Sequence, residues 1–542
     1  MKFTEKDLLL GMMTATTNNQ HDGSACLVAN GVTLGCFEEE RYIRYKHAIG
    51  HLPINAIAAA LRLQGASIRD VAGIFVSAAK HPDIFARIKL YLEHYFGHAP
   101  EITGIHHQEA HLASAFYPSG FDEAMLISFD GLGDFESMVT AVGRGADITV
   151  LERKGVPQSL GIYYQTLTQY LGFSGVGDEY KVMGLSAFGK PGIDLSSIIE
   201  IREEDYHIKA EVWERDPPSR NLLEPRFGRK LIDLHGPARL KGVPLSQRER
   251  DFAYAIQDNF EKAVLAVVKG LHRKTGLRKL GLAGGCALNC LTNMKILDLD
   301  FIDELFVQPA ATDQGSALGA ALLASARGGI KPGRIPHYYL GSEYGDEEIR
   351  QALTLCGVRA YSKPADLPAQ AAASLAAGKI IGLYHGRSEF GPRALGNRSI
   401  LANPAIADIK GEINRRIKFR EEFRPFAPAV LAESANEVFE MKSPSPFMTI
   451  TSRVREPWKK RIPGVVHVDG TSRVQSVARE TNPRFYDVIS AFHKATGVPL
   501  VVNTSFNVMG EPVVETPMDA IKTFYGCGLD ELFLGDYWIK KA

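Results

Sequence analysis

Two histidines and two aspartates in the sequence have the residue types of a metal site. His107 and His111 are four residues apart in a segment expected to be helical, so both imidazoles would lie on one face. Asp130 follows an apolar run and Asp313 precedes a helical one, and each would bring a carboxylate. Two imidazoles and two carboxylates suit iron, manganese or zinc better than a metal that prefers thiolates. A histidine pair that only packs or faces solvent is the alternative.

A turn of two glycines between a predicted strand and a predicted helix favours nucleotide binding. Gly284 and Gly285 follow the short apolar run 280–283, and a helix is expected to start after them. Glycines let the backbone approach a ligand closely, and N–H groups at a helix N-terminus attract phosphate. The position of the turn upstream of Asp313 strengthens this interpretation.

Two similar sets of three strands are expected to hold these groups. The first is predicted at 8–13, 24–29 and 32–37, with an Asn30-Gly31 turn; the second is predicted at 124–129, 137–142 and 148–151, with turns at Asp130-Gly131 and Arg144-Gly145. A β-β-β start that is used twice, each time followed by helices, is the plan of the superfamily of actin, sugar kinases and heat-shock chaperone ATPases. Two unrelated hairpins would produce part of the same pattern.

The chain is long enough for more than one domain. Its 542 residues exceed the size at which single cores stop growing. The stretch 202–250 is dense in charge and proline, which is typical of an irregular insertion, and 331–336 (KPGRIP) has the composition of a linker. We therefore predict an α/β protein with domains at 1–340 and 341–542.

Arginines beside glycine and proline mark the predicted C-terminal domain. They gather in 386–398, 418–426 and 470–473, and the polar turn 503–507 follows a strand predicted at 500–502. Guanidinium groups bind phosphate oxygens through two parallel hydrogen bonds, so a phosphate ligand is expected here. Surface pairing with the adjacent Glu421-Glu422 is the alternative.

Composition excludes several classes of protein. Lys plus Arg and Asp plus Glu both number 62, so the formal net charge is zero and nucleic acid is not an expected partner. The six cysteines form no C-x-x-C pair, which favours reduced thiols in a cytoplasmic protein. The N-terminus contains acidic residues where a secretion signal needs a basic start and a long apolar core, and no apolar run has the length of a membrane span, so no membrane partner is expected.

Across most of its length the chain resembles the NodU/CmcH-type O-carbamoyltransferases. The motifs that carry the resemblance, in order, are 21–25 (HDGSA), 38–47 (EEERYIRYKH), the pair His107 and His111, 177–185 (GDEYKVMGL), 284–289 (GGCALN), 391–399 (GPRALGNRS), 423–428 (FRPFAP) and 503–507 (NTSFN).

The resemblance implies an enzyme with two modules. An N-terminal actin-like (ASKHA) domain would be similar to threonylcarbamoyl-adenosine transferases, and the C-terminal α/β domain would be YrdC-like. The C-terminal domain would make carbamoyl-adenylate from carbamoyl phosphate and ATP, with Mg²⁺ accompanying the ATP. The N-terminal domain would then pass the carbamoyl group to a hydroxyl of a specialised metabolite, such as an antibiotic, a toxin or a glycan signal.

Site residues also follow from the resemblance. The metal, Fe²⁺ or another divalent transition metal, would be held by His107, His111, Asp130 and Asp313; the nucleotide would contact Gly131, Glu179, Lys181, Gly284, Gly285 and Asn289; and carbamoyl phosphate would contact Arg393, Lys418, Arg424, Arg473 and Ser505, with Lys418 and Arg473 also taking part in catalysis.

The resemblance leaves the base and the acceptor to be argued from the residues. His21 is the expected base, because a neutral imidazole can take a proton near pH 7. Ordering of the Asp22-Gly23 turn is the alternative role for this side chain. Acceptor choice is expected from 41–47 and 202–250, and a homodimer is left open.

Three alternative functions differ from this one in features that the sequence can test. A hydrogenase-maturation carbamoyltransferase would need an acylphosphatase-like start, zinc-finger cysteines and the reverse domain order. A tRNA threonylcarbamoyl-adenosine transferase would fit poorly with balanced charge and a fused C-terminal domain. A small-molecule kinase or ATP-binding chaperone of the actin-like superfamily would have no use for the histidine pair and should purify without a tightly held transition metal.

Overall fold

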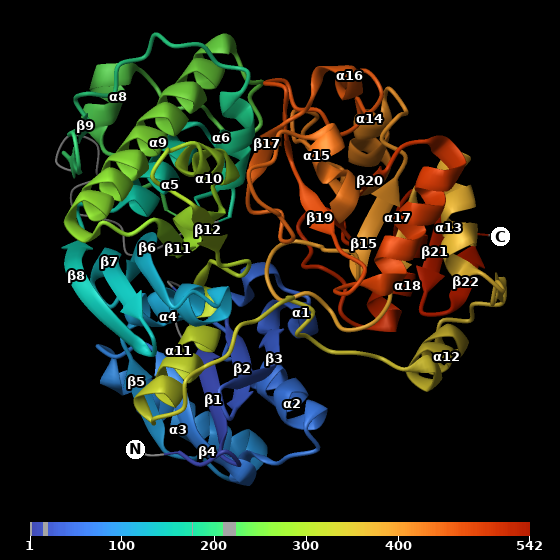
Figure 1. Cartoon of the computed structure of the whole chain (residues 1–542), viewed down its shortest axis with the longest axis horizontal. Helices are drawn as coiled ribbons and strands as arrows, with labels where there is room; N and C mark the ends of the chain where they lie inside the picture. Colours follow the sequence, from blue (N-terminus) through green and yellow to red (C-terminus); the bar gives the residue numbers. More distant parts are fainter. Residues whose placement is uncertain (1–2, 15–19, 176, 210–223, 542) are drawn as a thin grey trace. The chain divides into compact units, whose positions relative to one another are not determined.

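A computed structural model describes residues 3–14, 20–175, 177–209 and 224–541 (Figure 1). By its internal contacts the chain forms two compact units. Unit 1 comprises Met1–Glu39 and Ala48–Ile335, and unit 2 comprises Glu40–His47 and Pro336–Ala542. The middle of the predicted 202–250 insertion, 210–223, lies outside the described residues. Among the helices of the described part, none is long and apolar enough to cross a membrane.

Unit 1 contains two five-stranded sheets with the same topology. The sheet orders are β3-β2-β1-β4-β5 and, read from its other edge, β8-β7-β6-β11-β12. In each sheet the first three strands are antiparallel neighbours, and the fourth and fifth run parallel to the first. The strands are β1 Leu8–Met13, β2 Ser24–Ala29, β3 Val32–Glu38, β4 Val71–Ser77, β5 Ile102–Ile105, β6 Glu123–Gly133, β7 Glu136–Arg144, β8 Asp147–Gly155, β11 Lys279–Ala283 and β12 Glu304–Val307. The predicted duplication of an actin-like half is therefore confirmed.

Short hairpins define the register of both halves, and one predicted turn is wrong. Asn30 and Gly31 both have positive φ, as a two-residue hairpin requires, so this predicted turn is confirmed. Asp130-Gly131 is not a turn, because β6 continues through Gly133 with an irregularity in its pairing after Phe129. The chain reverses instead at Asp134 and Phe135, which have φ of 50° and 66°. The Asp134 carboxylate accepts three backbone N–H bonds and so holds this left-handed turn.

Each half adds helices to its sheet. They are α2 Ile54–Leu63, α3 Pro82–Phe96 and α4 His107–Ser119 in the first half, and α5 Leu160–Tyr170, α6 Glu179–Ser186, α8 Arg229–His235, α9 Gln247–Thr275, α10 Cys290–Leu297 and α11 Asp313–Arg327 in the second, where a small hairpin, β9 Ile199–Ile201 and β10 Tyr206–Ile208, is also inserted.

Helices α4 and α11 pack against each other between the two sheets (Figure 1). Their backbones come very close, since a Cβ on Gly319 would lie 1.7 Å from the Ala110 carbonyl oxygen. On its other side α11 meets β1, where a Cβ on Gly11 would lie 1.9 Å from the Ala317 carbonyl. Residues 313–325 of α11 are buried, which explains why this helix is apolar almost all round. Small residues thus set the short distance between these two helices.

Unit 2 is built on an eight-stranded mixed sheet in the order β13-β22-β21-β14-β15-β20-β16-β19. Its strands are β13 Tyr361–Ser362, β14 Ile381–Tyr384, β15 Arg398–Ala402, β16 Ala427–Leu431, β19 Gln475–Val477, β20 Leu500–Ser505, β21 Glu531–Leu534 and β22 Tyr537–Lys540, with a separate pair β17 Thr451–Arg453 and β18 Thr471–Arg473. The helices are α1 Glu39–Ile43, α12 Asp346–Leu355, α13 Leu367–Ala376, α14 Ile409–Ile413, α15 Ala435–Val438, α16 Glu456–Lys459, α17 Pro483–Thr496 and α18 Pro517–Gly526.

One strand of unit 2 is longer than predicted. The stretch 503–505, expected to begin a turn, continues β20 and pairs with β15 residues Leu401, Ile400 and Ser399. The sequence pattern failed here because Asn503, Thr504 and Ser505 are polar, and the partner strand supplies the hydrogen bonds that keep them extended. Ser505 consequently lies at a strand end, where its side chain can face a site.

Candidate functional site

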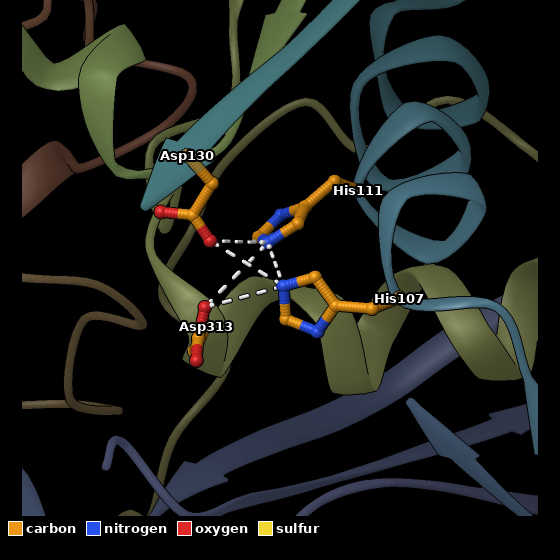
Figure 2. A group of neighbouring side chains, drawn as sticks. All are labelled: His107, His111, Asp130 and Asp313. Carbon is orange, nitrogen blue, oxygen red and sulfur yellow. Dashed lines mark hydrogen bonds and ion pairs between the residues drawn. The ribbon is translucent and has the colours of Figure 1, made fainter. Parts of the chain in front are cut away.

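Four side chains of unit 1 converge on one point (Figure 2). His107 Nε2 lies 3.4 Å from Asp130 Oδ2 and 3.5 Å from Asp313 Oδ1. His111 Nε2 lies 3.5 Å and 3.6 Å from the same two oxygens, and the two Nε2 atoms are 3.1 Å apart. One atom from each residue falls within 4.8 Å of all the others. The structure therefore brings together all four residues predicted as metal ligands.

Two helix N-termini and one strand end position this cluster. His107 is the first residue of α4 and Asp313 is the first residue of α11, while Asp130 lies in β6. The β6–β7 turn holds the histidine directly, because Asp134 Oδ2 accepts the His107 N–H at 2.8 Å. Gly133 lies against the His107 ring, where a Cβ would come within 2.0 Å of a ring carbon. Only glycine leaves room for the imidazole at this point.

Neighbouring groups orient the ligands. Ser77 Oγ lies 3.3 Å from His107 Nδ1, so the opposite ring nitrogen faces the cluster. The Gly285 N–H donates to Asp130 Oδ1 at 3.2 Å, while Oδ2 faces the histidines. A hydrogen bond to the outer atom of a ligand, as found here for His107 and Asp130, fixes ligand orientation in protein metal sites. The donor set and its surroundings fit a divalent transition metal.

The charges in the cluster reinforce one another. Burial opposes ionisation of Asp130, but the hydrogen bonds from His107 and His111 hold its pKa well below the ordinary value. Burial would likewise lower the pKa of His111, yet Asp130 and Asp313 raise it to about 9. The Asp130 carboxylate thus stays ionised in a buried place with two imidazoles close to it. A divalent cation can replace the imidazole protons as the source of positive charge.

His21 lies beside this cluster, and its pKa is raised. Its Nδ1 is 3.1 Å from Asp22 Oδ2, and Asp22 in turn accepts a hydrogen bond from Thr312 next to Asp313. Burial lowers the pKa of His21, but Asp22, with Asp313 and Asp130, raises it to about 10. A cation held by Asp130 and Asp313 would offset two of these charges. The predicted role of His21 as a base depends on that compensation.

The predicted nucleotide turn lies next to the metal ligands. Gly284 has φ of 86°, and a Cβ there would lie 2.2 Å from the Phe129 carbonyl, so the glycine is required. Asn289 is the N-cap of α10: its Oδ1 accepts from Thr292 N, and its amide exchanges hydrogen bonds with Gln257. The side chain of Asn289 is therefore occupied within the protein.

The other predicted nucleotide residues surround the same turn. Lys181 Nζ is 3.0 Å from Asp178 Oδ1 and lies over the Phe173 ring. Glu179 begins α6, and its charge helps to raise the pKa of the half-buried Cys286 thiol, after desolvation and Asp130. The carbonyl of Gly131 accepts a hydrogen bond from the N-cap residue of α5.

A second polar site lies in unit 2 around Lys418. Its ammonium lies among oxygens of Ser505 and Asn507, at 3.3 Å from Ser505 Oγ and 2.7 Å from Asn507 Oδ1. Burial, followed by the charges of Arg420 and Arg424, lowers the pKa of Lys418 well below its ordinary value. Lys418 ends a short π-helix, Asn414–Lys418, and the next residue, Phe419, has φ of 47°. Such irregular backbone is frequent at functional sites.

The side chain of Gln475 links the backbone segments that carry the other predicted phosphate ligands of unit 2. Its amide donates to the Leu395 carbonyl at 2.7 Å and accepts from Asn503 Nδ2 at 2.8 Å. Leu395 belongs to the loop that carries Arg393, and Asn503 belongs to the strand that ends at Ser505. Arg473 ends β18, two residues before Gln475. Arg424 Nη1 lies 3.7 Å from Glu421 Oε2, so the predicted alternative of carboxylate pairing holds for this arginine in part.

Two arginines in the first arginine-rich stretch have a structural role. Arg398 is fully buried and donates to the carbonyls of His385, Gly386 and Asn397 beneath the Tyr384 ring. Arg387 donates to the Gly341 carbonyl at 3.0 Å. Sequence reasoning did not identify the buried acids that organise the sites, Asp134 and Glu389, because an aspartate in a hairpin and a glutamate in a loop carry no distinctive pattern.

Comparisons with known proteins give the family of this chain. Residues 97–322 match the family model described as carbamoyltransferase N-terminus, and residues 372–541 match carbamoyltransferase C-terminus. The nodulation protein NolNO of Sinorhizobium fredii is 38% identical over 96% of this chain and 79% of its own length. The nodulation protein NolO of Bradyrhizobium diazoefficiens is 42% identical over 81% and 79%. Full-length HypF, solved with phosphate and nucleotide, is 15% identical with a TM-score of 0.33 over 60% of this chain and 56% of that one.

The chain is a two-unit α/β protein. Its first unit is a duplicated actin-like unit that brings two histidines and two aspartates together, and its second is a separate α/β unit. Family membership is specific: the chain belongs to the carbamoyltransferases of the NodU/CmcH type. It is therefore an enzyme that transfers a carbamoyl group.

Proposed function

We propose that the protein is an ATP-dependent O-carbamoyltransferase with one half-reaction in each unit. Unit 2, as a YrdC-like domain, makes carbamoyl-adenylate from carbamoyl phosphate and ATP with Mg²⁺. Unit 1 passes the carbamoyl group to a hydroxyl of a specialised metabolite. The observation that carries the proposal is the presence of two separate polar sites of different chemistry, one rich in cations and one in metal ligands.

In unit 2 the cations are suited to bind and activate phosphates. Burial and neighbouring arginines lower the pKa of Lys418, because they disfavour its charged form. The negative charge of a bound phosphate would favour that charged form. Arg393, Arg424 and Arg473 bind the phosphates of the two substrates and Ser505 orients them. Water hydrolyses carbamoyl phosphate to carbamate and phosphate, and a carbamate oxygen then attacks the α-phosphorus of ATP as the bond to pyrophosphate breaks. These cations stabilise the departing charge.

In unit 1 the metal would be held by His107, His111, Asp130 and Asp313, and when bound it supplies a Lewis acid that polarises the carbamoyl or phosphoryl oxygens. The Gly284-Gly285 turn presents backbone N–H groups to the nucleotide beside these ligands. The acceptor oxygen attacks the carbamoyl carbon while the bond to AMP breaks. His21, held by Asp22, is the group placed to take the hydroxyl proton once the neighbouring carboxylates are neutralised.

Release of pyrophosphate and AMP from ATP tests the proposal. The assay contains the purified full chain and no acceptor, and it is run with and without carbamoyl phosphate. Release of pyrophosphate that depends on carbamoyl phosphate is the expected result. ATP turnover that is indifferent to carbamoyl phosphate would contradict the proposal and would favour a kinase or chaperone activity.

A further inference from the structure

A short segment from the first part of the sequence belongs to unit 2 by its contacts. This segment, Glu40–His47, which we call the strap, follows β3 and precedes α2, both of which belong to unit 1. Arg44 donates to the carbonyls of Val513 and Pro512 at 2.6 Å and 2.9 Å. Tyr42 shares a hydrogen bond of 2.8 Å with Ser342. Acceptor choice was predicted from 41–47, and both arginines of that stretch, Arg41 and Arg44, donate hydrogen bonds to residues of unit 2.

Arg41 is the most deeply buried cation of the strap. Only 3% of its side chain is exposed, and its Nη2 donates to the Gly391 carbonyl at 2.8 Å. Its Nη1 lies 3.9 Å from Oε2 of Glu515, which is equally buried. Glu515 is held in place by a hydrogen bond from Ser388. A buried guanidinium is costly unless it is paired, so this geometry is strongly specified.

The carbonyl that Arg41 binds begins the loop that carries Arg393. Glu389 Oε1 accepts hydrogen bonds from the backbone N–H groups of Leu395, Asn397 and Arg398 in this loop. Asn503 Nδ2 donates to the Ala394 carbonyl at 3.2 Å. These bonds hold the second half of the loop.

The first half of the loop depends on Gly391. This residue has φ of 114°, a conformation that side chains other than glycine rarely adopt. The hydrogen bond from Arg41 to the Gly391 carbonyl lies two residues before Arg393. An arginine of the strap thus restrains the end of the loop that Glu389 does not hold.

We propose that Arg41 is a positioning residue for Arg393, so that the carbamoyl phosphate site of unit 2 is completed by a strap from the N-terminal part of the sequence. The inference rests on the proposed function, because it takes Arg393 as a ligand of carbamoyl phosphate. Preorganised side chains bind and orient substrates without a further entropic cost. Loosening the Gly391 end of the loop should therefore weaken the binding of carbamoyl phosphate more than the binding of ATP.

The test uses Arg41→Lys and Arg41→Ala in the full chain, with pyrophosphate release measured at varied carbamoyl phosphate and varied ATP. Lysine keeps the positive charge beside Glu515. It cannot reproduce the guanidinium group, whose second nitrogen donates to the Gly391 carbonyl. We expect KM for carbamoyl phosphate to rise at least about tenfold in Arg41→Ala and less in Arg41→Lys, with KM for ATP changed less than about threefold. Transfer from supplied carbamoyl-adenylate should be retained.

Arg69→Ala is the matched control, because Arg69 also donates to a glycine carbonyl, that of Gly97, on the exposed surface of unit 1. It should behave as the unmodified protein. An unchanged KM for carbamoyl phosphate in Arg41→Lys, or an equal rise in both KM values, would overturn the positioning role. Absence of carbamoyl phosphate-dependent release in the unmodified protein would instead overturn the proposed function. If Arg41→Ala does not fold, the comparison of Arg41→Lys with Arg69→Ala still decides the question.

Discussion

His107 and Asp313 occupy the same position in the two halves of unit 1. Each is the first residue of the helix that follows the fifth strand of its half, α4 after β5 and α11 after β12. In both halves a glutamine follows, Gln108 and Gln314. The duplication therefore places two helix N-termini at one point, and their partial positive charges favour negative charge on the side chains there. The metal ligands are a product of this internal symmetry, with Asp130 added from β6.

Removal of His107 is predicted to separate the two half-reactions. His107→Ala takes away one of four ligand atoms and one partner of both carboxylates, so the protein should lose bound metal and carbamoyl transfer. Carbamoyl phosphate-dependent pyrophosphate release should remain, since its cations lie in unit 2. Metal analysis of the purified protein and the two separate assays check this. Glu109→Gln, on the same helix but bound to Arg153 and Arg327, is the control and should keep the metal. Loss of pyrophosphate release in a folded His107→Ala protein would contradict the division of labour.

Asp134 is predicted to support the metal site without touching it. Its carboxylate accepts N–H bonds from Ala79, Lys80 and His107, and burial of this carboxylate is outweighed by those bonds, which lower its pKa. Asp134→Ala should leave N–H groups unsatisfied and let the start of α4 move. We expect metal affinity to fall by about 10- to 100-fold, as is usual when a group that orients a ligand is removed. A metal titration with a competing chelator measures the change. Asp134→Asn keeps one accepting oxygen and should lose less; an affinity equal to that of the unmodified protein in both variants would refute this role.

The sequence predicted the duplicated fold because alternating apolar strands and glycine turns are local signals. Asn30-Gly31 is such a signal, since both residues tolerate the positive φ of a tight hairpin. Asp130-Gly131 misled the same reasoning. Its strand continues because the turn at Asp134 is stabilised by N–H groups from distant residues, which no local pattern reveals.

Some features of the candidate sites could be predicted from the sequence and others could not. The spacing of His107 and His111 and the fork chemistry of arginine could be predicted, because both depend on residue type and on short distances along the chain. The burial of Arg398 against the His385 carbonyl, 13 residues away, and the bond from Arg41 to Gly391, 350 residues away, could not, because both depend on tertiary packing. Long-range packing decides whether an arginine faces a ligand or the protein itself.

Arg473 is predicted to be essential for activation alone. Arg473→Ala removes a cation from the phosphate site of unit 2, so carbamoyl phosphate-dependent pyrophosphate release should fall at least about 100-fold. Transfer from supplied carbamoyl-adenylate should stay within about twofold of the unmodified protein. Arg479→Ala provides a matched control in the same unit, because Arg479 is exposed and pairs with Asp487. Equal loss of both half-reactions in Arg473→Ala would argue against two separate sites.

A buried neutral histidine should make the protein sensitive to acid. Burial, followed by the charges of Arg484 and Arg398, lowers the pKa of His385 to about 3, although a hydrogen bond with the backbone of Gly396 opposes the shift. The unfolded chain binds this proton near the ordinary value of about 6.5, so it holds more protons than the folded protein below that pH. The contribution of His385 to the free energy of unfolding is complete above pH 6.5 and is lost between about pH 6.5 and 3, by about 1.4 kcal/mol per pH unit.

The measurement for His385 is a comparison of unfolding midpoints against pH. His385→Asn removes the titrating ring and keeps an amide N–H that can replace the N–H donor of the imidazole. The unfolding midpoint of this variant should therefore depend less steeply on pH between 6 and 4 than that of the unmodified protein. Above pH 7 the unmodified protein should be the more stable of the two, because the variant leaves a cavity beside Arg398. His493→Asn, which removes a histidine near the end of α17, is the control for the loss of a titrating ring elsewhere in the unit. Parallel pH dependences for the unmodified protein and His385→Asn would show that the ring takes up its proton in the folded state, and the assignment of a neutral buried histidine would be wrong.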